Sequence, residues 1–226
     1  KDYDDSLKNF QKEHNLTIFH LMGQHVNYKQ RYRTKQARFW ASSYEDKRPE
    51  LTNAQRKMLS HYDNATLYND SIVAQIVKRF QKQDAIVIYV PDHGEECYEE
   101  NRGFICRNHS AEIDWPLAHY EFEIPFWIYC SPKYIRNHRD IYRQIRKAKD
   151  KRFMTDALPH LLLYLAGIET PTYKEEYNIL SPKYDEMRPR ILKNSADYDK
   201  LRDAHLEKIK KEESKKVKKK GETDYE

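Results

Sequence analysis

Residues 85–95, AIVIYVPDHGE, are the stretch that decides the fold predicted from this sequence. The first six residues are apolar and mostly β-branched or aromatic, and Pro91 closes the run. A short, wholly apolar run of this kind is typical of a strand buried on both faces, as in the middle of a parallel sheet. The sequence therefore predicts a central strand at residues 85–90.

Polar residues that suit a metal site follow this strand directly. Asp92 and His93 stand side by side, and both residue types are good ligands for zinc or a similar divalent ion. In open α/β sheets, ligands bind outside the carboxyl ends of the strands. Gly94 allows a sharp turn or a close approach to a ligand. The alternative is a polar turn with a capping Asp and an incidental His, and the motif alone leaves both interpretations open.

A second apolar run, LTIFHLM at residues 16–22, predicts another buried strand that ends at Gly23 and is followed by His25. Between the two runs, Thr52 predicts a helix N-cap with Gln55 as its capping-box partner. Apolar residues then recur at helical spacing up to Phe80. This strand–helix–strand order predicts a right-handed βαβ unit with parallel strands, which brings His25 to the same sheet edge as the Asp-His pair.

The rest of the chain predicts an α/β fold on a mostly parallel sheet flanked by helices. We expect a strand at residues 124–130, an exposed basic helix at 135–150, and an apolar helix at 154–165 that stops at Gly167. The long irregular segment from residue 95 to about 120 suggests a functional loop. Residues 1–15 predict a polar helix or arm.

Two domains are predicted: residues 1–194 form the globular part, and residues 195–226 form a charged, Lys-rich helix or tail. The tail is either solvated or in contact with an anionic membrane surface. The net charge is 41 − 36 = +5, of which the last twenty residues carry 8 − 6 = +2, and this modest excess does not support a nucleic-acid partner. No apolar run reaches the ~18 residues of a membrane span, and we expect the chain itself to be soluble. It opens without Met and reads as a piece of a longer protein.

Cysteines and arginines leave further alternatives open. Cys97 and Cys106 share one loop and could form a disulfide, remain thiols or bind a metal, although their spacing matches no standard zinc module. Arg31, Arg33 and Arg38 alternate with aromatic residues and could bind an anionic ligand. A surface loop whose long side chains cover apolar patches is the favoured interpretation of this segment.

Taken together, five motifs in order resemble the catalytic domain of the bacterial phosphoethanolamine transferases, within the sulfatase and alkaline-phosphatase superfamily. They are FHLMGQHVNYKQRY, HYDNATLYNDSI, IYVPDHGEE, the downstream His109, and the strand EIPFWIYCSP. The resemblance covers most of residues 16–190 and implies an alkaline-phosphatase/sulfatase-like fold that is incomplete at its N-terminal side. DHGE alone would be a weak signal, because it occurs across sulfatases generally.

The resemblance also implies roles for individual residues. Asp92 and His93 match the family's zinc ligands, and His25 and His109 match histidines that hold the phosphoryl group or the phosphoethanolamine, with a looser match at His109. The family's metal-binding Glu and nucleophilic Thr have no counterpart here. We therefore expect this chain alone to bind metal weakly and to be inactive, because a catalytic zinc usually has three protein ligands.

The implied activity is a metal-dependent transfer of phosphoethanolamine from the phospholipid phosphatidylethanolamine to a lipid A or sugar acceptor. In the parent protein this would take place in the periplasm, at the bacterial inner membrane. Departures from the family pattern, such as Gln24 and Val26 around His25, leave the acceptor open. One rival is a hydrolase of the same superfamily, a sulfatase or phosphodiesterase. The other is a non-catalytic module that binds anionic polymers.

Overall fold

The structure is a computed structural model that describes residues 14–107 and 112–223. The predicted arm at residues 1–15 therefore lies almost wholly outside the described residues. The chain divides into two compact units, residues 1–72 and 73–226, and the boundary falls within the long helix α2. Each unit is described by itself below.

Helix α2 (Asn53–Phe80) begins as the sequence predicts. The hydroxyl of Thr52 accepts a hydrogen bond from the backbone N–H of Gln55 at 3.3 Å, and the Gln55 side chain accepts one from the backbone N–H of Thr52 at 2.7 Å. This reciprocal capping box satisfies two amides that the first helical turn would otherwise leave without partners. The capping-box prediction is confirmed.

A buried amide organises the rest of the first unit, which contains the short helices η1 (Tyr28–Gln30), η2 (Thr34–Gln36) and η3 (Ala41–Tyr44). The Asn64 side chain on α2 accepts from the backbone N–H groups of Arg38 and Phe39 at 2.6 and 3.1 Å. It donates to the carbonyls of Phe39 and Ser60, both at 2.8 Å. All its polar capacity is used, so the hydrogen bonds of this buried side chain offset its desolvation and fix the preceding loop.

The predicted buried strand at residues 16–22 is wrong. No strand is assigned in this run, and Leu16, Ile18 and Met22 are 75%, 80% and 60% exposed. A run of apolar residues becomes a buried strand only when neighbouring strands cover it and pair with its backbone. In the part of the chain that the structure describes, no strand is paired with this run.

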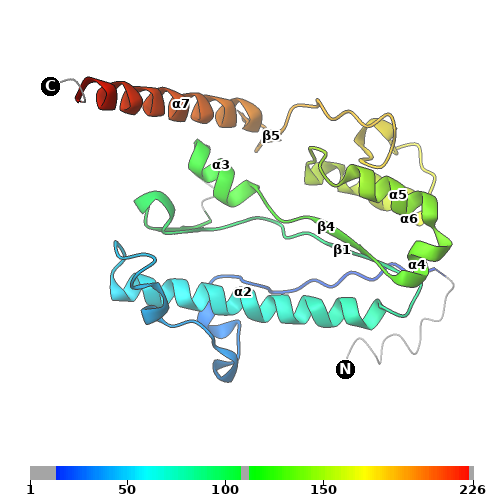
Figure 1. The fold of residues 1–226 in the computed structure, drawn as a ribbon. Helices are drawn as coiled ribbons and strands as arrows, with labels where there is room; N and C mark the ends of the chain where they lie inside the picture. The colour runs from blue at the N-terminus through cyan, green and yellow to red at the C-terminus, as the bar shows by residue number, and fades with distance from the viewer. Residues whose placement is uncertain (1–13, 108–111, 224–226) are drawn as a thin grey trace. The chain divides into compact units, whose positions relative to one another are not determined.

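The second unit contains the other predicted strands. β1 (Ile86–Tyr89) and β4 (Trp127–Cys130) lie side by side in Figure 1 and pair in antiparallel register, with Tyr89 opposite Trp127. Their aromatic rings stack with centroids 5.2 Å apart. Both strand predictions are confirmed, although β1 is half-buried along its length rather than buried on both faces.

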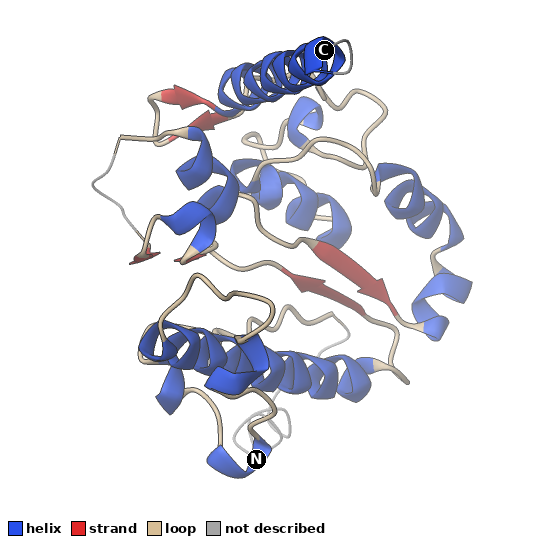
Figure 2. Ribbon diagram, turned by 60° about the vertical axis from the view of Figure 1, so that its left-hand side comes forward, coloured by secondary structure: helices blue, strands red, loops and turns tan. Residues whose placement is uncertain are grey.

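The α/β class is correct, but the mostly parallel sheet is not. Three two-stranded sheets are assigned within the described residues, and all are antiparallel (Figure 2). Besides β1 and β4, they pair β2 (Glu96–Cys97) with β3 (Phe104–Cys106) and β5 (Ile191–Leu192) with β6 (Ala196–Asp197). The predicted parallel pairing required a strand at residues 16–22, and that strand does not form.

Helices follow β4, and two of them, α5 (Arg139–Ala148) and α6 (Leu158–Ala166), form the cluster against which β4 packs. They are accompanied by α4 (Pro132–Asn137) and by the short helices η5 (Thr155–Ala157) and η6 (Glu175–Tyr177) beside α6. Leu161 is fully buried in the cluster that α6 forms with α5, and Ile128 of β4 packs against this cluster. Gly167 ends α6 in the left-handed conformation, φ +65°, as the sequence predicts.

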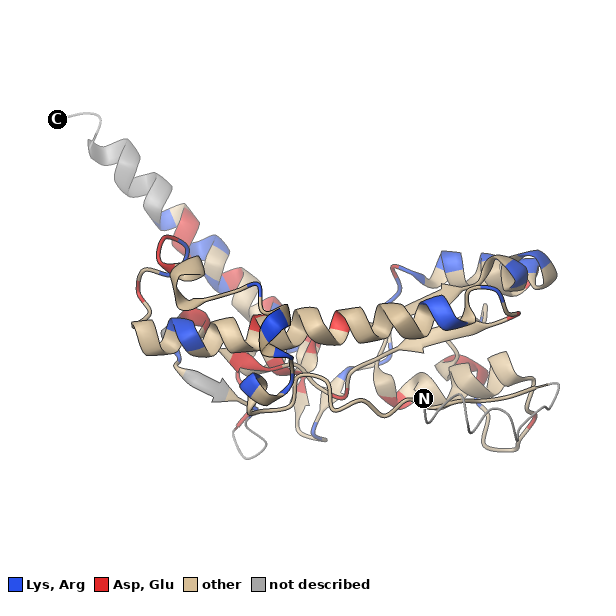
Figure 3. Ribbon diagram, turned by 90° about the horizontal axis from the view of Figure 1, so that it is seen from below, with Lys and Arg blue, Asp and Glu red and all other residues tan. Residues whose placement is uncertain are grey.

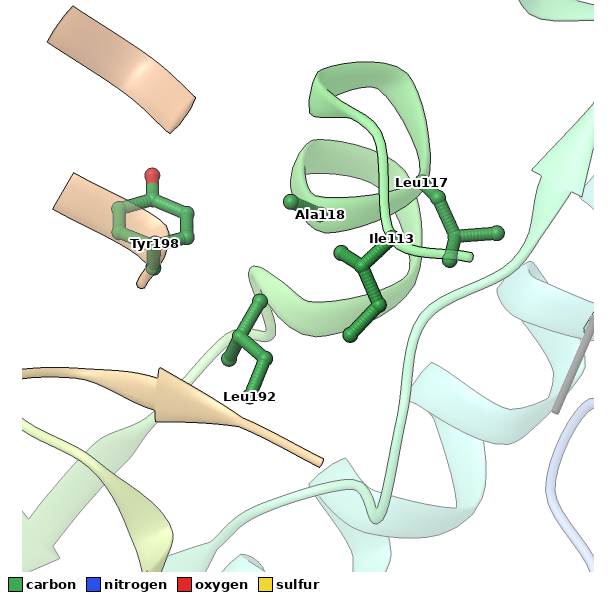
Figure 4. Close-up of a cluster of buried hydrophobic side chains, with 5 residues drawn as sticks. All are labelled: Ile113, Leu117, Ala118, Leu192 and Tyr198. Carbon is green, nitrogen blue, oxygen red and sulfur yellow. The ribbon is translucent and has the colours of Figure 1, made fainter. Parts of the chain in front are cut away.

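The segment expected to be a long irregular loop is partly ordered. It contains the β2–β3 hairpin, the short helix η4 (Glu99–Asn101) and helix α3 (Trp115–Phe122). Leu117 and Ala118 of α3 belong to one buried cluster with Ile113, Leu192 of β5 and Tyr198 of the last helix, α7 (Tyr198–Thr223) (Figure 4). α3 is therefore fixed on one face by β5 and α7.

Charges of both signs follow one another along the described side chains of α7 (Figure 3). The side chains of α7 are described as far as residue 215. Along this part of the helix they do not form a surface of uniformly positive or negative charge. Within the described residues, none of the helices is both long enough and apolar enough to cross a bilayer.

Candidate functional site

The candidate site begins where β1 ends. Asp92 has a side chain that is 85% exposed, whereas the His93 side chain is 24% exposed. The next residue, Gly94, donates its backbone N–H to the carbonyl of Glu121 at 2.8 Å. A Cβ added at Gly94 would lie 2.2 Å from the carbonyl oxygen of Tyr120. The sequence suggested that Gly94 serves a turn or a ligand, and the structure shows a close approach to the backbone of α3 instead.

An ion-pair network fixes the start of α3 relative to the β2–β3 hairpin. Asp114 caps α3 by accepting from the N–H of Leu117 at 3.0 Å. Arg102 donates to Asp114 at 2.7 Å and to the fully buried carboxylate of Glu96 at 3.0 Å. A buried carboxylate is tolerated only when it is paired in this way. Through α3, the network holds the backbone that anchors Gly94.

The carboxylates of this network have perturbed acidities. Burial raises the pKa of Glu96, against the opposing effect of the Arg102 guanidinium. Burial also opposes ionisation of Asp114, but the hydrogen bonds from Leu117 and Arg102 outweigh it and lower the pKa of Asp114. Neither carboxylate is directed at the Asp-His pair, so we assign both to support of the loop.

The hydrogen bonds of His93 define its tautomer. Nδ1 lies 2.7 Å from the carbonyl oxygen of Gly94, which can only accept, so Nδ1 carries the proton. Nε2 lies 2.6 Å from Nη1 of Arg107, which can only donate, so Nε2 presents its lone pair. A neutral imidazole whose proton is held by a backbone carbonyl is the form that binds metal ions.

Asp92 provides a second ligand atom beside that lone pair. Oδ2 of Asp92 lies 3.6 Å from Nε2 of His93. Zinc–oxygen and zinc–nitrogen bonds of about 2.0–2.2 Å at a tetrahedral angle would separate two ligand atoms by about 3.4 Å. The two residues therefore fit a shared zinc ion. Within residues 14–107 and 112–223, no cluster of three His, Cys, Asp or Glu side chains suited to a metal is found.

The described structure does not place either predicted phosphoryl histidine relative to the Asp-His pair. His25 belongs to the first unit, in an exposed turn where its backbone N–H bonds to the carbonyl of Met22 at 3.1 Å. His109 lies outside the described residues. Their roles remain predictions.

The cysteines of the hairpin are thiols, of which Cys97 is buried and Cys106 partly exposed. They lie on the paired strands β2 and β3. The Cys106 thiol is 3.7 Å from Oε1 of Glu95, within range of a weak S–H donor. Of the alternatives that the sequence left open, the disulfide is not formed between these two described cysteines.

Arg107 is the functional candidate that the sequence did not identify. It was one charged residue among many in the segment after Glu95. It lies 14 residues from His93 in the chain, and only the pairing of β2 with β3 brings it back. A cation soon after a DHGE motif is the only signal that the sequence carries.

The arginine-rich segment favours the surface-loop interpretation. Arg31 donates to the carbonyls of His25 and Val26 at 3.0 and 3.3 Å, and Arg38 donates to the carbonyl of Ala37 at 3.1 Å. These guanidinium groups support the backbone of their own loop. The module that would bind anionic polymers therefore has no specific geometric support here.

Known proteins resemble this chain over most of its length. The phosphoethanolamine transferase EptC of Escherichia coli K12 is 32% identical over 197 residues, which are 82% of this chain and 32% of that protein. The Kdo(2)-lipid A phosphoethanolamine 7''-transferase of the same strain is 31% identical over 140 residues, 61% of this chain and 23% of the relative. The chain spans about a third of the length of the EptC relatives.

Solved structures agree with the sequence relatives. The C-terminal periplasmic domain of E. coli EptC in complex with Zn has a TM-score of 0.70 and 27% identity, over 88% of this chain and 56% of that one. The corresponding domain of EptC from Campylobacter jejuni is similar in fold, with a TM-score of 0.62 and 22% identity over 81% of this chain and 57% of that one.

A family model supplies the remaining comparison. The model described as Sulfatase matches residues 1–168, about three quarters of the sequence. The Asp-His pair after β1 lies within this match. The chain is homologous to the EptC phosphoethanolamine transferases and belongs to the sulfatase family.

Proposed function

We propose that this chain is part of a zinc-dependent transferase that moves phosphoethanolamine from phosphatidylethanolamine to a lipid A or sugar acceptor. One observation carries the proposal: the neutral His93, with its lone pair on Nε2, stands 3.6 Å from a carboxylate oxygen of Asp92. Homology to phosphoethanolamine transferases supports the reaction class, and the named lipid A relative supports the acceptor class.

The residues divide into two roles. Asp92 and His93 hold the zinc ion, and His25 and His109 bind the phosphoryl group. A bound zinc ion neutralises the charge that develops on a phosphoryl group and lowers the pKa of a bound hydroxyl. The protein's own contribution at His93 is to fix the tautomer, since the Gly94 carbonyl holds the proton on Nδ1.

We propose the setting of the reaction from the relatives, since a similar solved domain is described as periplasmic. Residues 1–194 belong to a catalytic domain at the periplasmic side of a bacterial inner membrane. Residues 195–226 form a charged extension that could meet anionic headgroups through its lysines. We propose the transferase rather than the hydrolase because the relatives are named as transferases.

Zinc binding by the isolated chain tests the metal site. We expect one weak site, lost on extensive dialysis, because two ligands are fewer than the three that a catalytic zinc usually has. His93→Ala should weaken zinc binding at least about tenfold, measured by competition with a chromophoric chelator. Stoichiometric zinc that survives dialysis, together with turnover of a phosphodiester, would contradict the proposed weak site and the proposed inactivity of the isolated chain.

The chain offers a matched control for this experiment. His138 and Asp84 form a second Asp-His pair in the same unit, with Nε2 and Oδ1 3.4 Å apart. Asn137 already bonds to the other oxygen of Asp84 at 2.7 Å. This separation would suit a zinc ion as well as that of Asp92 and His93, so the pair tests whether separation alone is enough. Because Asn137 already holds the Asp84 carboxylate, His138→Ala should leave zinc affinity unchanged. Equal losses in the two variants would show that zinc binds adventitiously and would remove the basis of the proposal.

A further inference from the structure

We infer that Arg107 is a substrate-positioning residue, which occupies Nε2 of His93 in the metal-free chain and binds a phosphoryl oxygen once a metal has displaced it. The inference rests on the proposed function and extends it to a residue outside the recognised motifs. It begins from the 2.6 Å contact between Nη1 of Arg107 and Nε2 of His93.

The first step is that the guanidinium and a metal ion exclude each other. Nε2 of a neutral imidazole has one lone pair, and the Arg107 N–H group uses it in the structure. The proton on Nδ1 is held by the Gly94 carbonyl at 2.7 Å, so the ring presents the same lone pair to either cation. Zinc must therefore break the Arg107 contact before it can bind His93.

The second step is that the displaced guanidinium stays close. Arg107 directly follows Cys106, which is held in register opposite Glu96 of β2. Glu96 is fully buried and paired with Arg102, so this end of the hairpin is fixed. The side chain can swing away from His93, but its backbone remains tethered near the loop that carries Asp92.

The third step is electrostatic. A guanidinium beside a divalent cation is repelled unless an anion lies between them. A phosphoryl group would suit that place, because the planar donors of arginine bind phosphoryl oxygens and a metal held by Asp92 and His93 would attract the same negative charge. Metal and phosphoryl group should then strengthen each other's binding, and this coupling is reciprocal by thermodynamic necessity.

The experiment measures zinc affinity by chelator competition for the unaltered chain and for Arg107→Gln, without additive and with O-phosphoethanolamine. Without additive, Arg107→Gln should bind zinc roughly tenfold more tightly, the scale of one hydrogen bond to a charged group. O-phosphoethanolamine should raise the zinc affinity of the unaltered chain several-fold. It should raise that of Arg107→Gln much less.

Three controls make the outcomes distinct. Ethanolamine lacks the phosphoryl group and should have no effect. Arg143→Gln should behave like the unaltered chain, because the Arg143 side chain is 70% exposed and pairs with Asp140 on the same helix at 2.8 Å. Arg107→Lys keeps the charge without the planar fork and should show a reduced phosphoryl effect. Circular dichroism should give the same melting temperature for each variant as for the unaltered chain.

The inference and the proposed function fail differently. Zinc binding that depends on His93 but is unchanged in Arg107→Gln overturns the role of Arg107 and leaves the metal site standing. The role of Arg107 is likewise overturned if O-phosphoethanolamine strengthens zinc binding equally in both proteins. Absence of any His93-dependent zinc binding in either protein overturns the metal site and the inference together.

Discussion

The two apolar runs of the chain, residues 16–22 and 85–90, are similar in composition, and each is followed by a glycine and a histidine. Their environments are opposite. The second run forms β1, half-buried and paired with β4, whereas Ile18 in the first run is 80% exposed. The difference teaches that an apolar run specifies a potential strand, and that a partner strand decides whether the strand forms.

The two glycines after these runs differ in the same way. Gly94 has the carbonyl oxygen of Tyr120 where a Cβ would stand, at 2.2 Å. Gly23 has a positive φ of +49°, but the nearest atom to its added Cβ is Oδ1 of Asn69, at 3.8 Å. One glycine is required by packing and the other by backbone conformation.

The largest effect is expected from Gly94→Ala, which places a methyl group against backbone that cannot move aside alone. We expect a loss of about 3 kcal/mol in the free energy of unfolding, at the upper end of overpacking effects. Urea unfolding followed by circular dichroism measures it. Zinc affinity should fall too, because Gly94 supplies the carbonyl that holds Nδ1 of His93. A loss below about 0.5 kcal/mol, the usual range of surface substitutions, would mean that the loop does not approach α3 in solution.

A part of the chain could be predicted from the sequence where its signal is local, but not where it depends on a distant partner. Local signals sufficed for α2, whose capping box lies within four residues, and for the end of α6 at Gly167. Strand pairing was not predictable, because β1 pairs with a strand about 40 residues away and in the antiparallel sense.

Prediction of the candidate site was also limited to residues that are close in the sequence. Asp92 and His93 were found because they are neighbours in the sequence. Arg107 was missed because its position depends on the register of the hairpin, with Glu96 opposite Cys106. Burial of Glu96 beneath Arg102 was also not predictable, since nothing in the spacing of charges marks one carboxylate as internal.

Two separate alanine variants, one in each apolar run, test the comparison of residues 16–22 with residues 85–90. Ile88→Ala in β1 should cost about 2 kcal/mol, because Ile88 is half-buried opposite Ile128 and its truncation leaves a partial cavity. Ile18→Ala should cost less than about 0.5 kcal/mol, as for other exposed positions. Urea midpoints of the two variants provide the measurement. Equal losses would show that residues 16–22 are covered in solution, and the contrast between the runs would disappear.

Gly23→Ala is expected to cost less than Gly94→Ala or Ile88→Ala. Since the added methyl group meets nothing closer than 3.8 Å, only the left-handed backbone is penalised, by about 1 kcal/mol. Gly23→Asn should recover part of this loss, because asparagine tolerates the left-handed region better than alanine. The same urea unfolding measures both variants. An alanine variant as damaged as Gly94→Ala would indicate a hidden steric contact, whereas an unchanged one would show that the turn before His25 relaxes to a negative φ.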